Sequence, residues 1–219
     1  MIDIYVRELS GIWFGLASSA EKIVATVLGS DREQTLKALL RSLPPQADHQ
    51  IIEELSGFAE RTFLALEKAH KGIEGVKDFT LAIEYFPEPL ASVLKVAASI
   101  PPGYVSSYGS IAKAANTEPR TVGVIMASNP LYPIVPCHRV VGSDFSLVGY
   151  GGRKSPQALK AKLSRLSKEC RGFKSVKEVA VEGTMNRVYP TEYVIRKAEK
   201  EGLSLSTNHQ HTLSNYVAR

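Results

Sequence analysis

IVPCHRVV, residues 134–141, is the stretch on which the interpretation of this chain depends. It holds Cys137, one of only two cysteines in 219 residues. The β-branched residues on either side predict a short buried strand, bent by Pro136. The thiolate is the nucleophilic form of cysteine, and a neighbouring imidazole is one of the groups that can activate it. Cys137 beside His138 is therefore a candidate reactive pair, although the dipeptide alone is more often a core cysteine next to a hydrogen-bonded histidine.

The residues before this stretch predict two short helices joined by a tight turn. Residues 106–115 are typical of a serine-capped helix, and Asn116 to Pro119 supplies a turn and a new helix start. Residues 119–127 carry apolar side chains at helical spacing, and Asn129-Pro130 ends that run. Two such helices indicate a helix-turn-helix, whose second helix presents Arg120 near the end that usually approaches DNA.

Five short motifs follow one another in this region. Between Val105 and Gly152 the chain reads YGSIA, PRTVG, NP, PCHRVV and LVGYGG, in that order. The run resembles the O6-alkylguanine-DNA alkyltransferases, also called methylated-DNA–protein-cysteine methyltransferases. The resemblance is tight over the middle third of the chain and extends loosely from the N-terminus to about Glu169. It implies an α/β RNase H-like N-terminal domain and a mainly α, winged helix-turn-helix-like alkyltransferase domain.

Composition and pattern predict how the chain divides. With 219 residues and 44% hydrophobic content, it can bury a core in one large or two small domains. We expect an RNase H-like scaffold domain over 1–86, a DNA-binding and alkyltransferase domain over 87–171, and a C-terminal extension of unknown role over 172–219. The extension predicts a strand over 176–181, a helix opened by Pro190-Thr191-Glu192 that runs to about Gly202, and a polar end with His209 and His211.

The predicted scaffold shows no candidate site. Residues 2–8, 11–18 and 22–29 are short β-branched or aromatic runs that predict an antiparallel meander. A capping box at Ser30 to Glu33 predicts a helix through Leu43. Apolar residues at helical spacing predict a second helix over 48–71, and alternation predicts a strand over 79–85.

Charge and cysteine usage narrow the functional classes. Lys and Arg number 27 against 22 acidic residues, and the resulting net charge of +5 is compatible with phosphate contact but not diagnostic of it. Two widely spaced cysteines exclude a disulfide framework and a paired CxxC zinc site. We expect no metal and no cofactor. No apolar run is long enough to span a membrane, and the first residues lack the apolar core of a signal peptide.

The resemblance implies roles for residues at matching positions. Cys137 would take the alkyl group from O6 of a guanine flipped out of the duplex, and Arg120 would fill the vacated space from the minor groove. Tyr108 would donate a proton or hydrogen bond to the departing guanine, and Asn129 would brace the turn between helix and cysteine segment. Contacts with DNA are expected from Arg120, Ser106, Thr121, Gly123 and Arg139. The substrate pocket is expected to include Val140, Tyr150, Gly151 and Met126. On the residues alone, Arg120 is also compatible with an ordinary phosphate contact, the tyrosines with core positions and Asn129 with a plain cap.

His138 would act on Cys137 through water as a base, oriented by a carboxylate. Here the sequence departs from the family pattern. When Lys160, Leu163 and Ser164 are matched to the family helix, the position of the carboxylate falls on Ser167, and Glu169 comes two residues late. Either Glu169 reaches His138 through an irregular helix end or a shifted register, or the third member is absent; we favour Glu169.

Three classes of function remain to be separated. The first is a suicide repair protein that transfers an alkyl group once, from O6-alkylguanine and as a further candidate from O4-alkylthymine, to Cys137. The second is a lesion sensor without chemistry, and the third is a helix-turn-helix regulator. For the first class we expect a monomer that binds double-stranded DNA through the minor groove. It would be cytoplasmic and nucleoid-associated in a prokaryote, and nuclear in a eukaryote.

Overall fold

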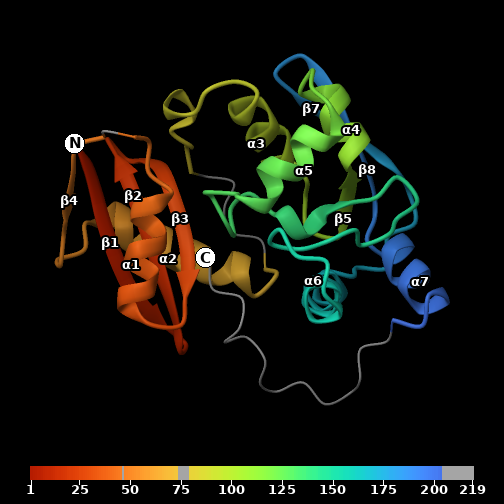
Figure 1. Cartoon of the computed structure of the whole chain (residues 1–219), viewed down its shortest axis with the longest axis horizontal. Coiled ribbons are helices and arrows are strands. Elements are labelled where there is room, and N and C mark those ends of the chain that lie inside the picture. The colour runs from red at the N-terminus through yellow and green to blue at the C-terminus, as the bar shows by residue number, and fades with distance from the viewer. Residues whose placement is uncertain (46, 74–78, 204–219) are drawn as a thin grey trace. The chain divides into compact units, whose positions relative to one another are not determined.

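The computed structural model describes residues 1–45, 47–73 and 79–203, and these form two compact units (Figure 1). The N-terminal unit comprises Met1–Pro87 together with Pro130–Ile134, and the C-terminal unit comprises Glu88–Asn129 and the described chain from Val135 onward. The predicted polar end with His209 and His211 lies outside the described residues. Within the described ranges, no helix is long and apolar enough to cross a membrane.

The N-terminal unit is built on a four-stranded sheet in the order β3-β2-β1-β4. Its first three strands form the predicted antiparallel meander, which is confirmed: β1 (Ile2–Leu9), β2 (Ile12–Ser19) and β3 (Lys22–Gly29). The two connections, Ser10-Gly11 and Ala20-Glu21, have positive φ at both residues, which is the conformation that tight hairpins require. The short β4 (His49–Ile51) pairs parallel to β1.

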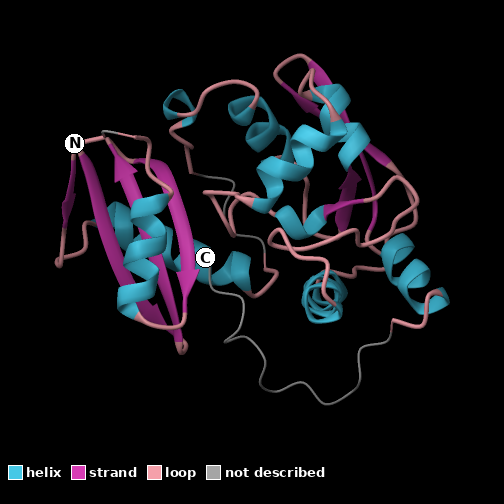
Figure 2. Cartoon of the chain, in the orientation of Figure 1, coloured by secondary structure: helices cyan, strands magenta, loops and turns pink. Residues whose placement is uncertain are grey.

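Two capped helices accompany this sheet (Figure 2). Helix α1 (Arg32–Arg41) begins after Asp31, whose carboxylate accepts a hydrogen bond from the Gln34 amide at 2.8 Å. Helix α2 (Gly57–His70) begins after Ser56 in the same way. The sheet and α1 share a core that contains Ile2, Ile4, Ala17, Val24, Ala25, Val27, Ala38, Leu39 and Ala82.

Two predictions for this unit were wrong in part. The helix expected from residue 48 begins only at Gly57, because residues 49–51 pair with β1 instead. The strand expected over 79–85 is reduced to one bridge between Leu81 and Ile23, followed by the 3-10 turn η1 (Ile83–Tyr85). Both departures depend on pairing with strands distant in sequence, which local alternation does not report.

The C-terminal unit contains the predicted helix pair. Helix α4 (Tyr108–Ala114) is capped by Ser107, whose hydroxyl accepts from the Ser110 amide at 3.0 Å. Helix α5 (Pro119–Ala127) follows a turn in which Asn116 has a positive φ. The remaining helices are α3 (Leu90–Ala98), α6 (Pro156–Lys168) and α7 (Glu192–Lys200). The two consecutive short helices, the helix from Leu90 to Ala98 and the helix after Thr191 are confirmed.

This unit also holds a mixed four-stranded sheet in the order β6-β5-β8-β7. The strands are β5 (Tyr104–Ser107), β6 (Val140–Val141), β7 (Lys177–Val181) and β8 (Thr184–Pro190). β6 runs parallel to β5, and β8 runs antiparallel to it on the other side. The expectation of a mainly α domain was therefore too simple. Both units combine helices with a sheet, so the fold is a two-unit α/β arrangement.

Candidate functional site around Cys137

Cys137 opens a single 3-10 turn, η2 (Cys137–Arg139), and does not lie on the predicted strand. Pro136 leaves the extended region, with φ −82° and ψ 73°, and its carbonyl accepts from the Arg139 amide at 2.8 Å. The chain becomes extended again only in β6. Cys137 is partly exposed, whereas His138 retains only 3% of its accessible surface. The turn thus places a reachable thiol next to a buried imidazole in the sequence.

Two neighbouring groups favour the ionised form of the thiol, but burial outweighs them and the thiol keeps its proton. Burial raises the pKa of the Cys137 thiol, while the charge of Lys162 and a hydrogen bond with Asn129 act in the opposite direction. Asn129 also donates to the Val135 carbonyl at 2.7 Å, so its side chain links the end of α5 to the cysteine segment. This is the bracing position that the resemblance implies. Because the resting thiol keeps its proton, nucleophilic chemistry here needs a base.

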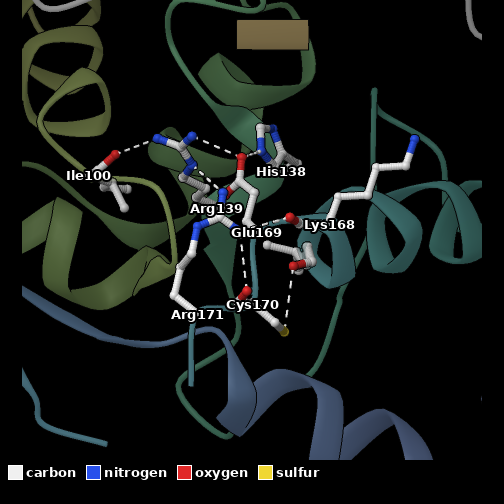
Figure 3. Close-up of polar contacts among 8 residues, drawn as sticks. Ile100, His138, Arg139, Lys168, Glu169, Cys170 and Arg171 are labelled. Atoms are coloured by element: carbon white, nitrogen blue, oxygen red, sulfur yellow. Dashed lines mark hydrogen bonds and ion pairs between the residues drawn. The ribbon is translucent and has the colours of Figure 1, made fainter. Parts of the chain in front are cut away.

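Glu169 lies against His138 at the end of α6 (Figure 3). Its Oε1 is 2.9 Å from His138 Nε2, and the carboxylate is only 1% exposed. Arg139 donates Nε to Oε2 and Nη2 to Oε1, each at 2.8 Å, and donates Nη1 to the Ile100 carbonyl at 2.6 Å. Ser167, the position on which the family spacing fell, instead donates its hydroxyl to the Leu163 carbonyl of its own helix. Of the two readings left open by the sequence, the geometry favours Glu169.

The pKa directions set the resting charges of this cluster. Burial lowers the pKa of His138 to about 4, and the hydrogen bond and charge of Glu169 oppose this only in part. Burial alone would raise the pKa of Glu169, but hydrogen bonds with His138 and Arg139 and the arginine charge bring it to about 2. At neutral pH the imidazole is neutral and the carboxylate is charged. Because a carboxylate only accepts, the imidazole proton lies on Nε2.

The other imidazole nitrogen is left available. Nδ1 of His138 is buried, and no described residue supplies it with a hydrogen-bond partner. With Nε2 donating to Glu169, Nδ1 carries the lone pair that can accept a proton. The arrangement can therefore take a proton from a neighbouring thiol, directly or through one water, while the carboxylate stabilises the imidazolium that results.

Whereas the sequence comparison had matched Lys160 to the family helix, the lysine that lies at this site is Lys162. Its side chain is fully buried and Nζ donates to the carbonyls of Val140, Leu147 and Gly149 at 2.6, 2.8 and 3.0 Å. Burial lowers its pKa to about 8. Lys160, which was matched to the family lysine, is exposed. The helical spacing contained the signal, since Lys162 lies four residues from both Ala158 and Leu166 on the buried stripe of α6.

Tyr108 stands at the first position of α4, close to these groups. Burial, with a smaller contribution from Cys137, raises the pKa of its phenol to about 12. Lys162 Nζ lies 5.9 Å from the centre of its ring. The phenol is therefore protonated at neutral pH and able to donate a hydrogen bond or a proton.

The remaining predicted positions divide between surface and interior. Arg120 is exposed at the start of α5, with Thr121 and Gly123 partly exposed behind it. Met126 on the same helix is buried. Past β6, Tyr150 is half-buried and Gly151 is exposed with a φ of 53° in a turn closed between Tyr150 and Arg153. For these residues, contact with DNA or substrate stays a prediction.

Two of the expected DNA contacts need correction. Ser106 has no exposed surface, and its hydroxyl lies 2.7 Å from Asn186 Oδ1. The Arg139 side chain is 11% exposed, and its guanidinium is occupied by Glu169 and the Ile100 carbonyl. Ser106 is interior because β8 covers that side of β5, and Arg139 is turned inward because a buried carboxylate needs a cation. We therefore exclude both from the DNA-contacting set.

Acidification is expected to destabilise the fold through His138. Its pKa is about 4 in the folded protein and ordinarily about 6.5, so the unfolded chain binds more protons between these values. The free energy of unfolding should therefore fall as the pH is lowered through this range, by on the order of 3 kcal/mol. Urea unfolding at neutral pH and near pH 4.5 measures the loss. His49→Gln, a change at an exposed histidine, should show the same loss of unfolding free energy on acidification. If His138→Asn shows that loss undiminished, His138 is not its cause.

Comparison with known proteins finds similarity over part of the chain. Residues 89–170 match the family model described as "6-O-methylguanine DNA methyltransferase, DNA binding domain". The resemblance to the O6-alkylguanine-DNA alkyltransferases is confirmed. The methylated-DNA–protein-cysteine methyltransferase of Pyrobaculum aerophilum is 60% identical over 53 residues, which make up 24% of this chain and 36% of that protein. Among the first alkyltransferase relatives, the aligned share of their own length is 36% to 52%.

Solved alkyltransferases share the fold over a longer stretch. The crystal structure of the O6-methylguanine-DNA methyltransferase of Pyrococcus kodakaraensis is 24% identical, with a TM-score of 0.53, over 77% of this chain and 99% of that one. The Mycobacterium tuberculosis OGT in complex with DNA is 22% identical, with a TM-score of 0.55, over 76% of this chain and 92% of that one. At this level of identity the likeness concerns the fold.

Proposed function

We propose that this protein repairs DNA by direct reversal, as a methylated-DNA–protein-cysteine methyltransferase that acts once. It would transfer the alkyl group of O6-alkylguanine irreversibly to Cys137 after the base is flipped out of the duplex; O4-alkylthymine is a further candidate substrate. The observation that carries the proposal is the array of a partly exposed thiol, an imidazole with a free Nδ1 and a buried carboxylate 2.9 Å from its Nε2. The family match over 89–170 supports the choice of alkyl transfer over other thiol chemistry.

The proposed reaction balances with the residues of this site. His138 Nδ1 takes the proton of the Cys137 thiol, directly or through a water, and Glu169 stabilises the imidazolium. The sulfur then attacks the alkyl carbon, a C–S bond forms and the C–O6 bond breaks with its electron pair going to the guanine. Tyr108 supplies the proton or hydrogen bond that the departing guanine needs. The product is a thioether, which has no route back to the thiol and explains a single turnover.

The walls of the substrate pocket would come from the segment after the thiol. Val140 would present its carbonyl to the exocyclic amine of guanine, as would Cys137, and Lys162 fixes the first of these carbonyls by its 2.6 Å hydrogen bond. Tyr150, Gly151 and Met126 would line the space for the alkyl group. A pocket shaped partly by backbone atoms would recognise guanine without a further charged side chain.

DNA would be bound by the helix-turn-helix, with α5 as the recognition helix approaching the minor groove. Arg120, Thr121 and Gly123 lie on this helix at its N-terminal half. A protein of the same fold has been solved in complex with DNA, which supports DNA as the partner. We further propose that residues 1–86 form an RNase H-like scaffold and that 87–171 form a winged helix-turn-helix alkyltransferase domain. The protein would act as a monomer wherever the DNA is: the nucleoid of a prokaryote, or the nucleus of a eukaryote.

Arg120→Ala is expected to slow transfer from duplex DNA by about 10-fold to 100-fold, because the extrahelical base would lose the side chain that fills its place. Transfer from O6-methylguanine supplied as the free base, which needs no extrusion, should change little. Single-turnover rates on the two substrates measure the difference. Arg61→Ala, at an exposed arginine of α2, is the matched control. Equal losses on both substrates would show that Arg120 does not act through the duplex.

The decisive experiment is intact-protein mass after incubation with a duplex that contains O6-methylguanine. Transfer to Cys137 distinguishes a repair protein from a lesion sensor, which would bind the same duplex without gaining mass. A regulator would instead prefer one operator sequence over all others, with or without the lesion.

A further inference from the structure

The chain after the family match is packed into the unit that holds the thiol. The match ends at residue 170, whereas β7, β8 and α7 follow it (Figure 1). β8 pairs antiparallel with β5, with Val105 opposite Tyr189. One hydrophobic core cluster joins this segment to β5, β6 and α6: Val105, Val141, Leu147, Leu163, Leu166, Val194 and Ala198. Residues 172–203 are thus part of the fold around the site.

Glu192 ties this segment to the chain that carries Glu169. Its Oε1 accepts hydrogen bonds from the backbone amides of Arg171 and Gly172 at 3.1 and 2.6 Å. Those amides follow Glu169, the C-cap of α6, by two and three residues, and Gly172 has a φ of 71°. The carboxylate of Glu192 therefore fixes the exit of the helix whose C-cap is Glu169.

An aromatic contact ties the same segment to the loop after β6. The ring of Phe145 makes edge contacts with Tyr189 of β8 and Tyr193 of α7, each with ring centres 5.2 Å apart. Phe145 lies in the loop whose Leu147 and Gly149 carbonyls accept from Lys162. This loop leads directly to Tyr150, so its position affects the predicted alkyl pocket.

A third contact reaches the strand before Tyr108. Asn186 of β8 and Ser106 of β5 have no exposed surface and form a buried hydrogen bond of 2.7 Å. Ser106 is two residues before Tyr108, next to the serine that caps α4. A buried polar pair fixes the register of neighbouring strands, because a shift would leave both groups unsatisfied.

The charge of this segment does not favour a second DNA-binding surface. Residues 172–203 hold six basic and five acidic side chains. On the hairpin, Glu178 stands opposite Arg187 in the strand register, so an acidic residue lies across from a basic one. Phosphate binding needs a concentration of positive charge, which this segment lacks. Its specific contacts point inward, toward the elements that carry the proposed site.

We propose that residues 172–203 are a positioning element for alkyl transfer, in which Glu192 holds Glu169 in place against His138 and Arg139. This inference rests on the proposed function. Glu192 touches none of the reacting groups and acts through the backbone at Arg171 and Gly172. A displacement of Glu169 would turn the imidazole away from the thiol without altering the recognition helix.

The test compares alkyl transfer with DNA binding in Glu192 variants. Glu192→Ala should lower the single-turnover rate constant at saturating O6-methylguanine duplex by about 10-fold to 100-fold, as misplacement of a catalytic group does. The Kd for the same duplex, measured in the Cys137→Ser background, should be unchanged. Glu192→Gln keeps the carbonyl oxygen that accepts from both amides and should restore most of the rate. Glu199→Ala, at an exposed glutamate of the same helix, is the control.

Each outcome decides the inference. A wild-type rate in Glu192→Ala, or a loss that follows a weaker Kd, would overturn it while leaving the proposed function intact. A wild-type protein that gains no methyl group would overturn the proposed function and this inference with it. If Glu192→Ala does not fold, Tyr193→Leu removes the contact with Phe145 instead, and a wild-type rate in that variant would count against the proposal.

Discussion

Wild-type protein is expected to gain the mass of one methyl group from a duplex containing O6-methylguanine, and Cys137→Ser to gain none. A serine hydroxyl holds its proton far more tightly than a thiol, so the ionised nucleophile that would attack the alkyl carbon is almost absent at neutral pH. The gain should stop at one methyl per chain, because the thioether has no proton to lose. Peptide mapping of the product locates the methyl group.

The second cysteine provides a matched control for this experiment. Cys170 lies one residue after Glu169, and burial together with the charge of Glu192 raises the pKa of its thiol. Cys170→Ser should therefore accept a methyl group as the wild type does. Methylation lost in this variant, or mapped to Cys170, would contradict the assignment of Cys137. No methyl gain in the wild type, with selective binding of the lesion retained, would indicate a sensor.

Local sequence rules predicted the elements whose stability is local. The meander, the capped helix α4 and the helix pair that ends at Asn129 follow from alternation, capping and turn residues within a few positions. The backbone of Cys137 did not follow from them. β-branched neighbours favour a strand there, but the turn after Pro136 and the parallel pairing that begins only at Val140 set the conformation.

Which residues of α6 face the candidate site was harder to predict from the sequence. Matching by family spacing selected the exposed Lys160 and pointed to Ser167. Burial selects Lys162 and Glu169 instead, since both are buried whereas Lys160 is exposed and Ser167 is partly exposed. A count of helical positions from the apolar residues would have identified Lys162 without knowledge of the fold.

Two contacts with distant parts of the chain were not inferred from the sequence. Ser106 lies in a motif otherwise attributed to DNA binding, yet a strand that begins at Thr184 covers it. Arg139 lies in another of these motifs and was also expected to face DNA, but it neutralises the carboxylate of Glu169, thirty residues away in sequence. Both partners come after the five short motifs in the chain, and no local pattern links them to the residues they contact.

Glu169→Gln is expected to slow alkyl transfer by about 100-fold or more while leaving the Kd for lesion-containing DNA unchanged. Arg139 donates to both carboxylate oxygens, and His138 donates to one of them. The amide group of a glutamine must face one of these two donors. If it faces His138, the imidazole proton moves to Nδ1 and the base is lost; if it faces Arg139, a buried donor pair is left unsatisfied.

A measurement of stability separates the contribution of Glu169 to the fold from its contribution to orienting His138. Removing one partner of a buried ion pair costs about 3 kcal/mol or more, so the variant should also unfold at lower urea concentration. Glu54→Gln, at an exposed glutamate of the N-terminal unit, should change neither quantity. The rate is therefore measured under conditions where the variant is folded, as judged by its unfolding curve. A folded Glu169→Gln protein with the wild-type transfer rate would show that the carboxylate supports the fold and does not orient His138.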